Sequence, residues 1–168
     1  MHISLPSSAR DHSGTLERIV KAEHRLAIDR IDSALRATNP LAYSLAEVCR
    51  ILQRLPGYTG VYVYALEGDN LVLKGFQGRP TEHTRIPAGE GICGASVQAN
   101  ATVIVADVCS DPRYLACNLE TRSEIVVPIF RGETYLAQID VDSDEPGAFD
   151  SDDEAFLADI ARRLEPLF

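Results

Sequence analysis

The sequence predicts an α+β fold in which a mainly antiparallel sheet is flanked by N- and C-terminal helices. Apolar residues recur at helical spacing near both ends of the chain, and runs rich in β-branched and aromatic residues fill its middle. The chain has 168 residues, which is the usual length of one domain. We therefore expect a loose, aperiodic arm over residues 1–14 and a single domain over residues 15–168.

Two helices are expected before the sheet. Residues 15–38 form the first, because apolar side chains recur there every three or four positions with charged residues between them. This helix is suited to contact a partner chain, and we expect a homodimer formed through it. Residues 41–55 form the second helix, which ends at a Pro-Gly pair. Cys49 belongs to the apolar stripe of this helix and is expected in the core.

The sheet is expected to contain two hairpins and one further buried strand. The first hairpin joins residues 58–66 to residues 71–76 through a Glu-Gly-Asp-Asn turn. The second joins residues 123–130 to residues 134–142 around an Arg-Gly pair. The run TVIVA at residues 102–106 is typical of a buried strand.

The remaining segments are turns and helices. A Gly- and Pro-rich stretch at residues 75–94 carries several turns and precedes a short helical segment near residues 95–99. Ser151 and Glu154 have the spacing of a capping box, and apolar residues follow at helical intervals. The chain therefore ends in an amphipathic helix.

The composition excludes several classes of function. Asp and Glu number 25 against 16 Lys and Arg, so the formal net charge is -9 and the pI is near 4.8. This balance works against binding to a nucleic-acid backbone or to an anionic membrane surface. No apolar run reaches the roughly 20 residues that span a bilayer, and the first residues lack the apolar core of a signal peptide. We expect a cytoplasmic protein with no nucleic-acid or membrane partner.

The four cysteines occur singly, not as CxxC pairs. They are too few for a disulfide scaffold, and a zinc site is not indicated, so we expect no bound metal. Cys93 and Cys117 lie beside glycine or polar residues, in segments expected to be loops, where backbone N–H groups favour a thiolate. Cys109 gives no independent signal, and His83 is expected in an exposed loop.

Two motif matches are set aside. Gly89–Gly94 reads GxGxxG, but residues 84–88 before it are too short and Pro-broken for the strand that opens a dinucleotide-binding unit. The glycines instead permit positive φ and a close backbone approach. Cys117 and Arg122 are separated by four residues, whereas a cysteine phosphatase loop has five. Neither nucleotide binding nor phosphoryl transfer is supported.

Three acidic residues on the predicted strands are candidates for chemistry. Asp140 and Asp142 are two positions apart, so both carboxylates point to one face of their strand. Such a pair holds an ammonium group, or its repulsion raises one pKa until that acid stays protonated and donates a proton, or it is simply a solvated strand face. Glu124 begins an apolar strand, where a charge needs a partner.

Several segments together resemble a GAF domain, a small-ligand-binding α+β fold, over roughly Leu41 to Leu167. They are FQGRP, RIPAGEGICG, TRSEIVVPI, QIDVDSDEPGAFDSDD and the final helix. More narrowly, the chain is similar to the free methionine-R-sulfoxide reductases. Their GxGxCG pattern is matched by Gly89–Gly94, their IAC segment by Leu115–Cys117, their SEIV by Ser123–Val126 and their DID by Asp140–Asp142.

The resemblance implies a thiol-dependent reductase of the free amino acid. Cys117 as thiolate would attack the sulfoxide sulfur and become a sulfenic acid. A second thiol, Cys93 or Cys109, would then close a disulfide, which an external dithiol system such as thioredoxin reopens. No cofactor is implied.

The same resemblance assigns the rest of the site. A protonated carboxyl among Glu124, Asp140 and Asp142 would donate to the departing oxygen, and the acids would also hold the substrate's ammonium group. The family's aromatic wall corresponds to Tyr58 and Tyr62.

Three departures from that pattern keep a second function open. His83 stands where the family usually has a further, often resolving cysteine, and Tyr58 stands where it has tryptophan. Residues 111–115 (DPRYL) are more typical of sensory GAF domains. The alternative is therefore a non-catalytic GAF sensor that binds a small molecule or responds to redox state. A third alternative is a dimerisation module without ligand.

Overall fold

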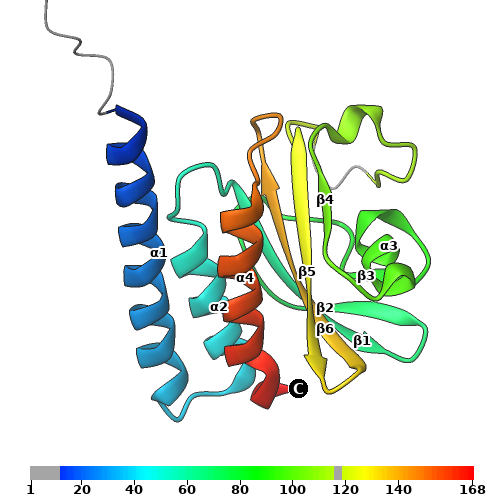
Figure 1. Ribbon diagram of the computed structural model, residues 1–168. Coiled ribbons are helices and arrows are strands. Elements are labelled where there is room, and N and C mark those ends of the chain that lie inside the picture. The colour runs from blue at the N-terminus through cyan, green and yellow to red at the C-terminus, as the bar shows by residue number, and fades with distance from the viewer. Residues whose placement is uncertain (1–11, 116–118) are drawn as a thin grey trace, which may run out of the picture.

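The computed structural model describes residues 12–115 and 119–168 (Figure 1). Within this part of the chain, six strands form one sheet in the order β3-β2-β1-β6-β5-β4, and all neighbouring strands are antiparallel. The predicted α+β class with an antiparallel sheet is confirmed. The strands are β1 Gly60–Glu67, β2 Asn70–Gln77, β3 Arg85–Pro87, β4 Val103–Val105, β5 Ser123–Arg131 and β6 Thr134–Ser143.

Helices cover the two faces of the sheet unequally (Figure 1). α1 (His12–Arg36), α2 (Leu41–Leu52) and α4 (Ser151–Leu164) lie on one face, and α3 (Gly91–Ala99) lies on the other. The short 3-10 helices η1 (Val108–Ser110) and η2 (Glu165–Leu167) complete the elements. Among the described residues, no helix has both the length and the apolar character needed to cross a bilayer.

Strand alternation separates an apolar core from a polar face. On β6, Ile139 and Val141 point toward α1, α2 and α4 and are fully buried in the larger core. Asp140 and Asp142 point to the α3 side, as their spacing predicts. The helix-facing core is completed by buried residues of α2 and α4, including Cys49, whose predicted core position is confirmed. Because the larger core lies on the face that packs against α1, α2 and α4, the polar side chains of β6 lie on the face toward α3.

Some boundaries differ from the sequence prediction. α1 begins at His12, inside the expected arm. α3 begins at Gly91 rather than near residue 95, so Cys93 lies in the first turn of a helix and not in a loop. β3 was not predicted, because three residues are too few to show periodicity; it pairs with β2 inside the Gly- and Pro-rich stretch.

The capping box of α4 is shifted by one residue from the predicted pair. Asp150, not Ser151, is the N-cap, and its carboxylate accepts hydrogen bonds from the backbone N–H groups of Asp152 and Asp153. The side chain of Asp153, not that of Glu154, accepts from the backbone N–H of Asp150. The spacing rule therefore found the right motif one position late, because the observed pair has Asp153 where the rule expects Glu or Gln.

A substitution at Leu157 tests how much the larger core contributes to stability. Its side chain is 0% exposed on the α4 face that packs on the sheet. Leu157→Ala should lower the free energy of unfolding by about 2–5 kcal/mol, because it removes buried methyl groups and leaves a cavity. Urea unfolding measures this loss. The control Leu119→Ala, at a side chain 92% exposed, should stay within about 0.5 kcal/mol of the unsubstituted chain; equal effects of the two changes would contradict this packing.

Candidate active site

Four buried polar side chains gather on the α3 side of the sheet, and we call them the acid–thiol cluster: Cys93, Glu124, Asp140 and Asp142. None is more than 6% exposed. The Cys93 thiol donates a hydrogen bond to Oδ2 of Asp140 at 3.2 Å. The sulfur of Cys93 and carboxylate oxygens of Glu124 and Asp140 all lie within 4.8 Å of one another. The structure thus joins residues from α3, β5 and β6 that are far apart in the sequence.

The β5–β6 register brings the carboxyl groups together. Glu124 is paired directly with Asp142, and Val126 is paired with Asp140. Side chains at paired positions of antiparallel strands lie on the same face with their Cβ atoms about 5 Å apart. Carboxylates held this close repel one another unless at least one of them binds a proton.

The glycines before Cys93 let α3 approach this face. Gly91 has φ +71°, a backbone conformation that residues other than glycine rarely adopt. A Cβ on Gly94 would lie 2.8 Å from the carbonyl carbon of Gly89, so only glycine fits where the helix crosses the loop before it. The GxGxxG match therefore marks a tight helix start, as the sequence analysis expected, and not a nucleotide site.

Burial shifts the pKa of each carboxyl group upward. Burial, followed by the charges of Asp140 and Asp142, raises the pKa of Glu124 well above its usual value, and Arg113 opposes this only in part. Burial and the neighbouring Asp142 raise the pKa of Asp140, although the Cys93 hydrogen bond works against them. Burial raises the pKa of Asp142 to about 7 despite its bond from Thr121. The cluster therefore holds protons near neutral pH, and a solvated strand face is excluded.

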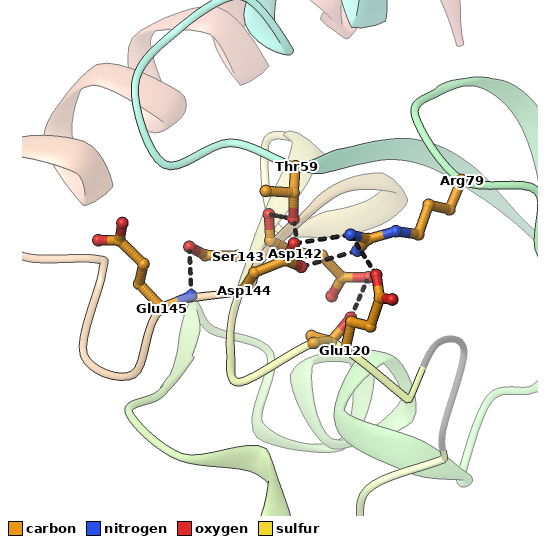
Figure 2. Close-up of polar contacts among 8 residues, drawn as sticks. Thr59, Arg79, Glu120, Asp142, Ser143, Asp144 and Glu145 are labelled. Carbon is orange, nitrogen blue, oxygen red and sulfur yellow. Dashed lines mark hydrogen bonds and ion pairs between the residues drawn. The ribbon is translucent and has the colours of Figure 1, made fainter.

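Ion pairs tie the surrounding segments together around Asp142 (Figure 2). Arg79, from the loop after β2, donates two hydrogen bonds to Asp144 at 2.7 and 2.6 Å and also pairs with Glu120. Thr121 donates to Oδ2 of Asp142 at 3.3 Å. The segment that begins at residue 119 is thereby tied to β6 through Thr121 and to the loop after β2 through Glu120.

The two tyrosines assigned to an aromatic wall lie on different faces of the sheet. Tyr62 is buried on the α3 side, opposite Asp140 in the register, and its hydroxyl donates to the carbonyl of Arg79. Tyr58 belongs to the helix-facing core, where its hydroxyl donates to Asp153 at 2.8 Å. The assignment of Tyr58 is therefore corrected: the turn before β1 directs it to the opposite layer.

Cys109 and His83 lie outside the acid–thiol cluster. Cys109 is exposed in η1. Cys117 lies outside the described residues. His83 makes hydrogen bonds through its backbone: its carbonyl accepts from the hydroxyl of Tyr64, and its N–H donates to the hydroxyl of Thr81.

Sequence reasoning missed polar residues that contact or neighbour the cluster. Thr121 binds Asp142, and the charge of Arg113 acts on Glu124. Gln138 is 0% exposed and lies two positions before Asp140 on the same strand face. Of these three residues, only Gln138 could have been found from the sequence, because it extends the pattern of polar residues at every second position that Asp140 and Asp142 form.

The cluster also presents metal-ligating atoms. A thiol sulfur and two carboxylate oxygens are ligands that Zn²⁺ takes in proteins. The sequence predicts no metal here, because Cys93, Glu124 and Asp140 show none of the short ligand spacings of metal motifs. Any ion bound here would occupy the same groups that hold the protons.

Comparisons with known proteins are consistent with this geometry. The GAF domain family model matches residues 41–166. The chain is 36% identical over 139 residues to GAF domain-containing protein A of Dictyostelium discoideum, with 82% of this chain and 87% of the relative covered. It is 35% identical over 148 residues to free methionine-R-sulfoxide reductase of Escherichia coli, with 86% and 88% covered.

A solved structure is similar over almost the whole chain. The X-ray structure of free methionine-R-sulfoxide reductase from Neisseria meningitidis in complex with its substrate superposes with a TM-score of 0.73 and 32% sequence identity. The match covers 99% of this chain and 95% of that one.

The raised pKa values predict a pH dependence of stability. A carboxyl group with a higher pKa in the folded state binds more protons there than in the unfolded chain, so stability falls as pH rises between the two values. For Asp142 that window runs from 3.8 to about 7. Asp142→Asn cannot ionise and should remove about 2–3 kcal/mol of the stability lost between pH 5 and pH 8. Urea unfolding at pH 5 and pH 8 checks it; the same pH dependence in both proteins would contradict it.

Proposed function

Since the chain belongs to the GAF domain family, we propose that it is a thiol-dependent reductase of free methionine-R-sulfoxide. The observation that carries the proposal is the acid–thiol cluster. Reduction of a sulfoxide requires a thiol as reductant and a proton for the departing oxygen, and the cluster holds carboxyl groups that keep protons beside the Cys93 thiol. Buried acids with raised pKa values beside a thiol are the arrangement that proton donation to a departing oxygen requires.

The carboxyl groups are the proposed general acids. Asp140 is in direct contact with a thiol, and its burial raises its pKa well above the usual value of an aspartic acid. Asp142, with a pKa of about 7, is able to exchange protons with solvent near neutral pH. Glu124 is subject to the charges of both aspartates and of Arg113, and an ionised member of the group would hold the substrate's ammonium.

The proposed reaction balances with two thiols. The thiolate of Cys117 attacks the sulfoxide sulfur and forms an S–S bond, and a carboxyl proton passes to the oxygen. The S–O bond then breaks and the hydroxyl passes to the Cys117 sulfur as the S–S bond breaks, leaving methionine and a sulfenic acid on Cys117. The Cys93 thiol then attacks the sulfenic sulfur, giving a Cys93–Cys117 disulfide and water. An external dithiol reduces this disulfide.

Cys93 is the better-supported resolving thiol. It lies inside the cluster at 3.2 Å from Asp140, whereas Cys109 is exposed in a short 3-10 helix. His83 occupies the position of the usual resolving cysteine, so this chain is proposed to resolve through the thiol at the start of α3.

The remaining proposals concern substrate and partners. Tyr62, buried opposite Asp140, is proposed as the aromatic wall against the substrate's methyl group. The partner is proposed to be a thioredoxin-type dithiol in the cytoplasm. A homodimer is proposed through α1, whose Val20 and Leu26 are 39% and 50% exposed.

The thiol roles are tested by turnover. With free methionine-R-sulfoxide, thioredoxin, thioredoxin reductase and NADPH, the unsubstituted protein should oxidise NADPH, and Cys117→Ser should abolish this. Cys93→Ser should allow a single turnover but stop recycling by thioredoxin. Cys109→Ser is the control and should keep full activity. Binding of the sulfoxide without NADPH oxidation would overturn the proposal and favour the sensor.

The general acid is tested at Asp140. Asp140→Asn keeps the shape of the side chain but has no acidic proton, so kcat should fall by about 10²–10⁴-fold with a smaller change in KM. Asp159→Asn, at a surface carboxylate of α4 paired with Arg162 and Arg163, is the control and should leave kcat unchanged. A kcat for Asp140→Asn within twofold of the unsubstituted protein would sink this role.

A further inference from the structure

Two buried polar atoms beside the acid–thiol cluster have no hydrogen-bond partner within residues 12–115 and 119–168. They are the amide nitrogen Nε2 of Gln138 and the carboxyl oxygen Oδ1 of Asp140, in side chains that are 0% and 3% exposed. The two residues are two positions apart on β6, so both side chains lie on the α3 side. Because buried polar atoms are nearly always paired, two neighbouring exceptions indicate a place for a bound group.

The two atoms belong to a row of polar contacts between α3 and β6, which we call the polar seam. Cys93 and Ser96, three residues apart on α3, face Asp140 and Tyr135. The hydroxyl of Tyr135 lies 3.1 Å from that of Ser96 and donates to Oε1 of Gln138 at 2.6 Å. This bond orients the Gln138 amide, so its Nε2 is the atom left for another partner.

Both unpaired atoms act as donors. The Gln138 Nε2 group carries two protons and accepts none. Oδ2 of Asp140 accepts the thiol proton of Cys93, so the proton that Asp140 supplies as the proposed general acid lies on the other oxygen, Oδ1. The seam therefore contains two buried donors on adjacent same-face positions, without an acceptor among the described residues.

We propose that Gln138 is a specificity-determining residue whose amide, together with Asp140, binds the oxygen of the sulfoxide substrate. This proposal rests on the proposed function. A sulfoxide oxygen is a strong neutral acceptor with lone pairs for two donors, and a neutral group enters a buried site at lower desolvation cost than a carboxylate. The thioether product has no such oxygen, so the same two donors favour substrate over product.

The role of Gln138 differs from that of Asp140 during the reaction. As the S–O bond breaks, negative charge develops on the oxygen, and fixed donors stabilise it without having to reorganise. Asp140 gives up its proton to that oxygen. Gln138 keeps its protons and only donates a hydrogen bond, so it recognises the oxygen without supplying the acid.

The experiment compares two ligands that differ by this oxygen. Binding of free methionine-R-sulfoxide and of methionine is measured by calorimetry in a Cys117→Ser background, so that no oxygen is transferred. Gln138→Leu should weaken sulfoxide binding about tenfold and leave methionine binding unchanged. Gln138→Met, which also fills the space without a donor, should give the same result and serves if the leucine variant does not fold.

Ser96→Ala is the matched control, because it removes a hydroxyl of the polar seam but neither of the two donors. It should keep the preference for sulfoxide over methionine. Equal weakening of both ligands by Gln138→Leu, or no weakening of either, would overturn the inference. Failure of the proposed function is seen separately, as absence of turnover in the unsubstituted protein whatever the calorimetry shows.

Discussion

The burial of three carboxyl groups between β5, β6 and α3 is the constraint on which the site depends. Glu124 and Asp142 are held opposite each other by the strand register, and Asp140 follows on the same face. Three negative charges are too costly to bury there, so protons or a cation must occupy the cluster. The same constraint explains the hydrogen bond from Cys93 and the one from Thr121, each of which satisfies a carboxyl oxygen. The fold therefore requires that these carboxyl groups bind protons or a cation.

Local patterns predicted most of the fold. Strand alternation placed Asp140 and Asp142 on the face away from the core, and helical periodicity identified α1, α2 and α4. The failures share one cause, which is that the deciding contact is remote in sequence. Tyr58 bonds to Asp153 across 95 positions, and β3 exists only because it pairs with β2. In the site, the types and spacing of the acids were predictable, but their contact with Cys93 depends on how α3 packs.

The similarity to known reductases and the geometry of the site support the same function by different kinds of evidence. Likeness to reductases of free methionine-R-sulfoxide covers nearly the whole chain. The structure adds what a pattern match does not, since it shows buried acids in contact with a thiol and, among the described residues, two buried polar atoms of the same strand without a hydrogen-bond partner. The ion pairs of Arg79 with Asp144 and Glu120 then give the segment after residue 118 a fixed position near those acids.

The alternation of β6 also bears on how this protein can change through evolution. Ile139 and Val141 fill the helix-facing core while Asp140 and Asp142 form the site, so one strand carries both sets with a period of two. An insertion or deletion of a single residue in β6 would exchange the two sets, placing carboxylates among α2 and α4 and apolar groups in the site. The residues that form the site and those that form the core are therefore tied together in this strand, and a length change between Gln138 and Asp142 would disrupt both at once.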